Sequence, residues 1–145
     1  MTLRPARAED AQAIAIVHRL AVRISLPFLP ELHAAEEDLW FVGQKLMVEN
    51  ETWVSEVDGA VVGYIAFRAG WIAHLFVHPD HQGRGLGPTL LAKAMADGAE
   101  RRLWTFQQNT RARTFYEKRG FTPEEFTDGE GNEEKVPDVR YVWGP

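Results

Sequence analysis

The first third of the chain spaces its hydrophobic residues as a helix does. Residues 9–24 place an apolar side chain at every third or fourth position, which predicts an amphipathic helix. These positions are Ile14, Val17, Ala21 and Ile24. The prolines of residues 25–30 interrupt the pattern, and residues 32–49 resume it, with acidic residues early where the helix dipole favours them. A short strand ended by Pro5 is expected before both helices.

The middle of the chain carries short apolar runs that are typical of strands. Three of them follow one another in residues 52–57, 61–67 and 71–77. The turn residues Asp58 and Gly59 separate the first two runs, which predicts a tight hairpin.

Helices and strands alternate in the second half. Pro88 stands in the first turn of an expected helix, where proline is tolerated, and Asn109 and Gly120 are suited to begin and end another. The expected elements are helix 88–100, strand 102–108, helix 109–120, and strands 121–126 and 139–143 around the polar loop 127–138. The order β-α-α-β-β-β-α-β-α-β-β predicts an α/β fold with a mixed central sheet of about six to seven strands and helices on both faces.

Composition narrows the classes of function. A chain of 145 residues suits one domain over 1–145, and the absence of cysteine excludes disulfides, thiolate metal sites and a cysteine nucleophile. No apolar run approaches the ~20 residues of a membrane helix, and no apolar signal core opens the sequence, so a cytoplasmic location and no membrane partner are expected. The formal charge of −5 argues against a nucleic-acid partner.

The most informative motif is the glycine-rich stretch HPDHQGRGLGPTLL, residues 78–91. It leaves an apolar strand and enters a helix, so unhindered backbone N–H groups and the helix dipole together favour an anion such as phosphate. A plain strand-to-helix turn that needs glycine for its dihedral angles is the alternative. The glycines alternate, and no lysine precedes a serine or threonine, so neither the dinucleotide fingerprint nor the phosphate loop of NTPases fits.

These residues resemble the acetyl-CoA signature of the GNAT superfamily of N-acetyltransferases, whose core pattern is Q/R-x-x-G-x-G/A. Gln82, Gly85 and Gly87 fill that pattern. A second family motif, a helix that starts at asparagine and ends in FYEKRGF, is matched by residues 109–121. The element order agrees along essentially the whole chain, so the resemblance implies a single N-acetyltransferase domain with a mostly antiparallel sheet.

The resemblance implies a set of residues that bind acetyl-CoA, the acetyl donor, with no metal. The pantetheine arm would lie along residues 75–77, where the N–H of Leu75 is an oxyanion donor. The pyrophosphate would contact the N–H groups of residues 82–87. The full set is Leu75, Phe76, Val77, Gln82, Gly83, Arg84, Gly85, Leu86, Gly87, Pro88, Thr89, Asn109 and Tyr116.

Tyr116 stands in the family's position for the acid that protonates the departing thiolate. An ordinary helix tyrosine, packed between helix and sheet, is the alternative. Asn109 would contact the pantetheine arm, and it can also simply cap its helix. The basic residues Arg111, Arg113 and Lys118 could contact the 3′-phosphate of CoA, and the alternative is that they form a solvated helix face.

The sequence departs from the family at the general base, because the strand before the turn has no carboxylate and Ala73 stands where relatives can have an acid. His74 is the one ionisable candidate inside that strand, with a satisfied core histidine as the alternative. Further candidates for the general base are Glu31, His33, Glu36 and a chain of water molecules. His74, His78 and His81 cross a strand end and a turn without a firm fourth ligand, so no metal site is expected.

The acceptor implied by the resemblance is a primary amine of a small molecule or peptide, attacked directly in a ternary complex. Residues 123–138 hold seven acids against Lys135, and such a rim would attract a cationic amine, while a solvated acidic loop is the alternative. Three aromatic residues are candidates for the pocket wall: Phe28, Trp40 and Trp71. A non-catalytic CoA-binding or partner-binding domain on the same scaffold is the second function considered, and a homodimer is left open.

Overall fold

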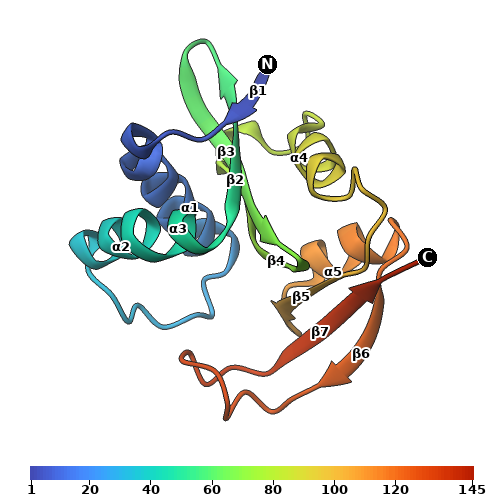
Figure 1. The fold of residues 1–145 in the computed structure, drawn as a ribbon. Helices are drawn as coiled ribbons and strands as arrows, with labels where there is room; N and C mark the ends of the chain where they lie inside the picture. Colours follow the sequence, from blue (N-terminus) through green and yellow to red (C-terminus); the bar gives the residue numbers. More distant parts are fainter. The chain divides into compact units, whose positions relative to one another are not determined.

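A computed structural model describes all residues 1–145, and Figure 1 shows its elements. The strands are β1 (Thr2–Pro5), β2 (Glu51–Val57), β3 (Ala60–Arg68), β4 (Gly70–Val77), β5 (Arg101–Phe106), β6 (Thr122–Phe126) and β7 (Asp138–Trp143). The helices are η1 (Ala8–Asp10), α1 (Ala11–Ser25), α2 (Ala35–Phe41), η2 (Val42–Leu46), α3 (Met47–Glu49), η3 (Pro79–His81), α4 (Leu86–Ala94) and α5 (Thr110–Glu117). The seven strands follow the order β1-β2-β3-β4-β5-β7-β6. The pairs β1–β2, β2–β3, β5–β7 and β6–β7 are antiparallel, and the pair β4–β5 is parallel. The predicted mixed, mostly antiparallel sheet is confirmed.

The chain divides into two compact units. The first comprises Met1–Arg68 and Ile72–Ala96, and the second comprises Ala69–Trp71 and Asp97–Pro145. The boundary falls inside β4, so one continuous strand contributes to both units. A single N-acetyltransferase domain over 1–145 stays a prediction.

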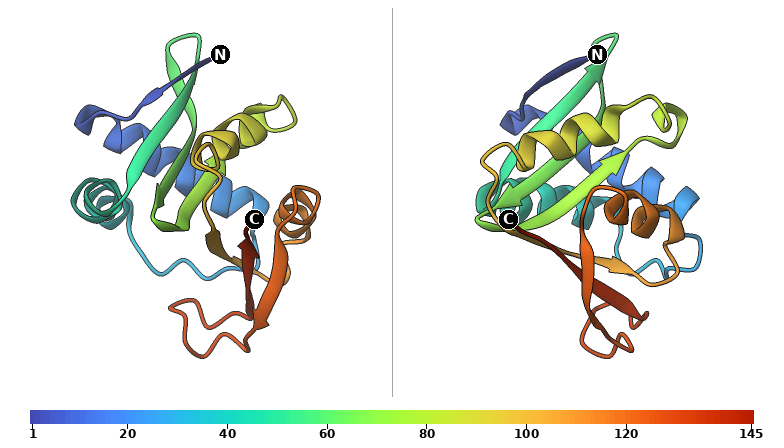
Figure 2. Two further views of the ribbon diagram at one scale, coloured as in Figure 1. Left: turned by 45° about the vertical axis from the view of Figure 1, so that its right-hand side comes forward. Right: turned by 90° about the vertical axis from the view of Figure 1, so that its right-hand side faces the viewer.

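In the first unit, helices cover both faces of the β2–β3 hairpin (Figures 1 and 2). The hairpin turns through Asp58 at φ 53° and Gly59 at φ 79°, as the sequence predicts. Alternate residues of the two strands pack against α1 and η2, in a core that includes Ile14, Val42 and Tyr64. On the other face α4 approaches closely at Gly63, where an added Cβ would lie 3.2 Å from Leu90 Cδ1.

Two predicted helices differ in length from the observed ones. The helix expected over 32–49 begins at Ala35, because the Glu37 carboxylate accepts a hydrogen bond from Ala34 N–H at 3.0 Å, and it contains a π-helical turn, η2. The helix expected over 88–100 is Leu86–Ala94. It starts two residues early because Gly85 caps it at φ 81°, and the chain turns again at Gly98, where φ is 68°.

In the second unit, α5 lies on one face of the β5–β7 ladder. Arg113 Nε of α5 donates to the Tyr141 hydroxyl of β7 at 3.0 Å, and Tyr141 donates to Glu117 at 2.5 Å. The helix ends at Glu117 with Lys118 as its C-cap, and the turn that follows closes at a left-handed Gly120, where Phe121 N–H bonds to Tyr116 O and Gly120 N–H to Glu117 O. The predicted N-cap Asn109 is confirmed, whereas Gly120 lies two residues beyond the observed C-cap. None of the helices of the chain combines the length and apolar character needed to cross a bilayer.

Candidate active site

One edge of β4 is open over most of its length. Its parallel ladder with β5 contains only Gly70 with Arg101 and Trp71 with Arg102. Beyond Trp71, residues 72–77 have no partner in β5. Backbone N–H and C=O groups on such an edge can bond to an extended ligand as they would to an added strand.

The glycine-rich turn follows the end of this strand through η3. Gly83 and Gly85 have φ of 80° and 81°, and a Cβ added at either would meet no atom within 4 Å. Their dihedral angles therefore favour glycine, and the space above them is open. Leu86 and Gly87 are the first two residues of α4, so their N–H groups have no acceptor within the helix. This arrangement is suited to an anion, because open backbone meets the positive end of a helix.

Side chains hold the turn in place on both sides. Gln82 Nε2 donates to Val77 O at 3.2 Å, which ties the turn to the end of β4. The Thr89 hydroxyl donates to Gly85 O at 2.8 Å, so its proton is used within the chain. Arg84 is exposed at the turn, and Pro88 is the third residue of α4 rather than the first.

His74 lies in a group of aromatic rings on the α1 side of β4. Its ring stacks on His18 at 5.0 Å between centroids and meets Phe76 edge-on at 5.4 Å. The distance between His74 Nδ1 and the Tyr64 hydroxyl is 2.9 Å. The side chain of Phe76 belongs to this packing, so only its backbone is available to a ligand at the open edge.

Burial controls the ionisation of this group. Loss of hydration, with a smaller contribution from repulsion by His18, lowers the pKa of His74 to about 3. Burial also lowers the pKa of His18 and raises the pKa of Tyr64 far above its ordinary value. At neutral pH the three side chains are therefore uncharged, and Tyr64 keeps the proton that it can donate to His74.

His18 and Tyr64 were missed as site residues by sequence reasoning. His18 follows Val17 and lies four residues after Ile14 on the stripe of α1, so a histidine on an apolar helix face was the available signal. Tyr64 gave no such signal, because an aromatic residue in a buried strand is ordinary core.

The second unit contains Asn109 and Tyr116. The Asn109 side-chain oxygen accepts from Ala112 N–H at 3.2 Å, so its helix-capping role is confirmed. Tyr116 is 7% exposed and packs edge-on against Phe115 and Phe121. Burial raises the pKa of its hydroxyl, so the phenol remains protonated at neutral pH.

Several other candidates have structural partners. Glu31 pairs with Arg23 at 2.8 Å, and His33 pairs with Glu37 at 3.1 Å. His78 and His81 form an edge-on pair of rings at 5.7 Å, and no group of three or more His, Asp or Glu is arranged to hold a metal ion. Arg113 is held by Tyr141, as described above, which accounts for it without a ligand.

The combination of an open β4 edge, a glycine-rich turn and the α4 N-terminus agrees with comparison to known proteins. Residues 48–123 match the family model described as "Acetyltransferase (GNAT) domain". The chain belongs to the GNAT acetyltransferase family.

Curated relatives of this GNAT chain are N-acyltransferases by name. It is 33% identical over 97 residues to an uncharacterised N-acetyltransferase of Methanocaldococcus jannaschii, covering 56% of this chain and 43% of that protein. It is 32% identical over 112 residues to the L-amino acid N-acyltransferase MnaT of Escherichia coli, covering 69% and 64%. The chain spans about half the length of the Methanocaldococcus jannaschii protein and of an uncharacterised N-acetyltransferase of Archaeoglobus fulgidus.

Solved structures share the fold of the GNAT chain along its whole length. Apo YjaB from Escherichia coli has a TM-score of 0.80 at 23% identity, covering 99% of this chain and 98% of that one. The PaiA N-acetyltransferase from Thermoplasma acidophilum, solved with coenzyme A, has a TM-score of 0.77 at 21% identity, covering 100% of both chains.

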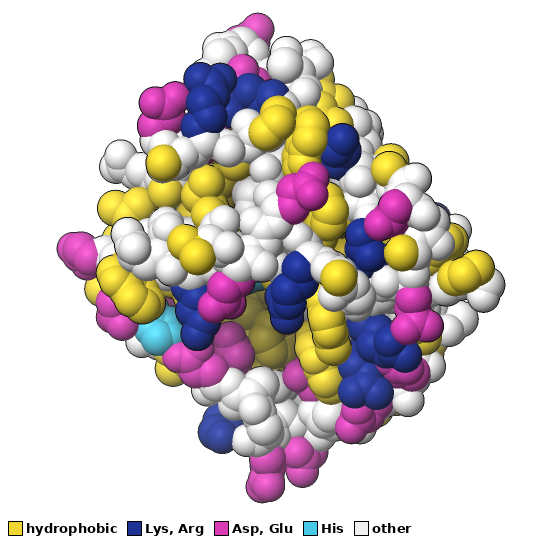
Figure 3. All heavy atoms as spheres, in the orientation of Figure 1, with side chains coloured by type: hydrophobic (Ala, Val, Ile, Leu, Met, Phe, Trp, Pro, Cys, Tyr) yellow, Lys and Arg dark blue, Asp and Glu magenta, His cyan; other side chains and the backbone are white.

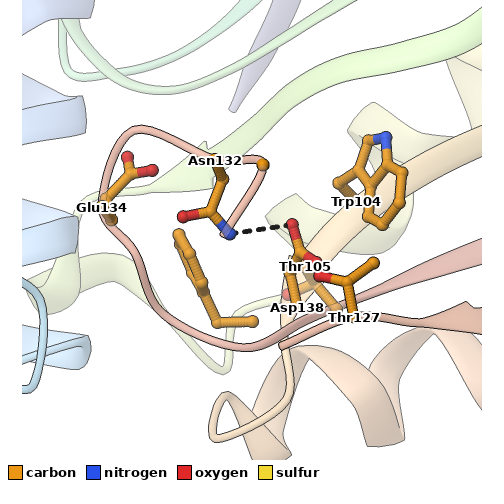
Figure 4. A pocket seen from close by; sticks show the side chains of 8 residues that line it. Trp104, Thr105, Thr127, Asn132, Glu134 and Asp138 are labelled. Atoms are coloured by element: carbon orange, nitrogen blue, oxygen red, sulfur yellow. Dashed lines mark hydrogen bonds between the residues drawn. The ribbon is translucent and has the colours of Figure 1, made fainter. Parts of the chain in front are cut away.

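The second unit of the GNAT chain also contains a pocket of about 440 Å³ at the end of the β5–β7 ladder (Figure 4). The pocket is lined by Trp104, Thr105, Phe106, Thr127, Gly131, Asn132, Glu134 and Asp138. The sequence suggested other aromatic walls, and one of these, Trp40, is 63% exposed on α2. Trp104 was assigned only to a strand, because its cross-strand neighbours were not known from the sequence.

Proposed function

We propose that this chain is an acetyl-CoA-dependent N-acetyltransferase that acts on a primary amine. The observation that carries the proposal is the open edge of β4 continuing through Gln82–Gly87 into α4. Together these supply a backbone edge for an extended arm and a helix N-terminus for a diphosphate. The family membership and the N-acyltransferase names of its relatives support it.

The donor would be held by the backbone of Leu75–Val77 and the N–H groups of residues 82–87, with Arg84 and Thr89 at the rim and Pro88 withholding one N–H. The resemblance to the family adds Asn109 and Tyr116 as candidates. The absence of a Cβ at Gly83 and Gly85 fits this assignment, because a ligand can approach the backbone there.

Acetyl-CoA supplies an acetyl group activated as a thioester, which a neutral amine converts to an amide with release of the CoA thiol. Leu75 N–H would donate to the oxyanion that develops on the carbonyl. Tyr116 would give its phenolic proton to the departing sulfur, and its raised pKa keeps that proton in place until it is needed. This balances the proton that the attacking nitrogen loses.

His74 is the proposed acceptor of the proton from the amine. Its uncharged ring can accept a proton, although a pKa of about 3 makes it a weak base. Its contacts with His18 and Tyr64 also support the alternative of a satisfied core histidine. Replacement of His74 by glutamine tests these alternatives, because full acetyl transfer by a folded variant would remove His74 as the base.

The experiment has two arms on the same material. Calorimetry with CoA measures binding, and thiol release from acetyl-CoA with a panel of amines, amino acids and lysine peptides measures transfer. Binding together with amine-dependent thiol release is expected. Binding without transfer to any amine would instead favour the non-catalytic CoA-binding domain, and no binding would overturn both.

A further inference from the structure

The connection between β6 and β7, residues 127–137, is a built loop. Gln107 Nε2 donates to Thr127 O at 2.9 Å and to Asp138 O at 3.0 Å, so both ends of the loop are fixed to β5. Asn132 Nδ2 donates to Val136 O at 2.7 Å, and Gly129 leaves no room for a side chain, since an added Cβ would lie 2.4 Å from Val136 C. The wall of the pocket is therefore preorganised.

The side chains that donate hydrogen bonds to the carboxylate of this pocket are neutral. The Asp138 carboxylate accepts from the Thr127 hydroxyl and from Asn132 Nδ2 at 3.1 Å, and both donors are neutral. Lys135, the one base of the loop, donates to Glu130 O at 2.7 Å. Figure 3 shows acidic side chains gathered at the tip formed by this loop.

Aromatic rings form the rest of the wall. Trp104 and Phe106 lie on the same face of the ladder as Asp138, because Phe106 pairs with Asp138 across β5 and β7 and Trp104 lies two residues away. Trp104 is 44% exposed, and Figure 4 places it across the pocket from Glu134, with Asn132 and Asp138 between them. Arg140 is 5.6 Å from the Trp104 ring, but ion pairs at 2.8 and 2.9 Å with Glu124 and Glu125 neutralise its charge.

An indole ring opposite a carboxylate, beside a second carboxylate, suits an organic cation with an apolar stem. We propose that the pocket of Trp104, Glu134 and Asp138 binds a protonated alkylammonium group. This inference rests on the proposed function and narrows its substrate class. Carboxylates favour the protonated form of an amine that they contact, and a protonated amine cannot attack a thioester. The group bound here is therefore a second, non-reacting cation of the acceptor.

The test uses the full chain without acetyl-CoA, titrated with pentylammonium chloride and followed by ¹⁵N NMR and calorimetry. Sodium pentanoate and 1-pentanol are matched probes with the same stem and a negative or no charge. Of the three probes, only pentylammonium is expected to bind saturably. Its binding should shift the NMR signals of the Trp104 indole N–H and the Asn132 side-chain amide. Equal binding of pentanol or pentanoate, or no binding of pentylammonium, overturns the proposal on the unmodified protein.

Two variants locate the site. Glu134→Gln is expected to weaken pentylammonium binding about two- to fivefold, and Trp104→Leu about three- to tenfold. Glu130→Gln makes the same charge change at an exposed position of the same loop outside the pocket, and should leave the affinity unchanged. Equal weakening by Glu134→Gln and Glu130→Gln would indicate a general charge effect and overturn the assignment.

The outcome is separable from that of the proposed function. If pentylammonium does not bind but acetyl transfer is intact, only the proposed substrate class is overturned. Ammonium binding with no CoA binding would leave the pocket in place and overturn the acetyltransferase.

Discussion

At the scale of single residues, burial gives the two proposed proton-transfer groups opposite pKa shifts. Loss of hydration disfavours the charged form of each side chain, so the pKa of His74 falls and that of Tyr116 rises. Both side chains are uncharged at neutral pH. A neutral imidazole and a neutral phenol are the forms in which a base can accept and an acid can donate.

The role of Tyr116 predicts a much larger effect on the rate than on CoA binding. Tyr116→Phe removes the hydroxyl and keeps the ring that packs on Phe115 and Phe121. We expect kcat to fall about a hundredfold, the lower range for loss of a general acid. The Kd for CoA, measured by calorimetry, should stay within about a factor of two of the parent value. An unchanged kcat would remove Tyr116 from the proton transfer.

The lowered pKa of His74 predicts that acid destabilises the fold. Between pH 6.5 and about 3 the unfolded chain binds a proton on this histidine that the folded chain does not. The free energy of unfolding therefore decreases as the pH falls through this window, by at most about 1.4 kcal/mol per pH unit for one proton.

Urea unfolding of the parent chain, of His74→Gln and of a matched control measures this dependence. His74→Gln should flatten the decrease, with a remaining slope from His18, whose pKa is also lowered. His81→Gln, at a histidine outside the His18–His74 group of rings, is the control and should keep the parent slope. Equal slopes in the parent and His74→Gln would contradict the burial of an uncharged ring.

At the scale of elements, the turn between β4 and α4 combines a conformational and a chemical requirement for glycine. Gly85 adopts φ 81° as the N-cap of α4, and the space beside it is open. The first requirement concerns the fold and applies to any residue at that angle. The second concerns the approach of a ligand and applies only where a ligand binds.

A pair of alanine variants separates these two requirements. Gly85→Ala and Gly59→Ala both place a side chain at φ near 80° with no atom within 4 Å of the new Cβ. Both should lose about 1–2 kcal/mol of unfolding free energy. Only Gly85→Ala should also weaken CoA binding, by about tenfold, or 1.4 kcal/mol. Equal CoA affinity of the two variants would contradict the proposed phosphate site.

At the scale of the whole molecule, the two units differ in size and share one strand. The second unit has about 50 residues and no disulfide, and chains of that size fold only marginally alone. Its largest buried side chains include Tyr141 and Phe121. The prediction of a single domain over 1–145 therefore implies that both units unfold together.

Loss of backbone amide signals from ¹⁵N NMR spectra in a urea series tests this prediction. Signals of Val54 in the first unit and Leu103 in the second should disappear at one common midpoint. A lower midpoint for the second unit would show that it is a separate folding unit.

Much of the fold and part of the site followed from the sequence, because local rules decide them. Hydrophobic period, turn residues and caps predicted all the strands, the Asp58-Gly59 hairpin, and the start of α5 at Asn109. The α4 boundaries were wrong because Gly85, rather than Pro88, caps the helix. The glycine-rich turn could be identified because its proposed contact with phosphate depends on backbone, and glycine spacing is visible in the sequence.

Only the tertiary structure decided which side chains meet. His18 and His74 are 56 positions apart in the sequence, and Trp104 and Glu134 are 30 apart, so no local pattern relates them. The sequence determined the elements and the residues that their own conformation demands. Packing of those elements decided the pKa of His74 and the walls of the pocket, because burial and proximity depend on contacts between distant segments.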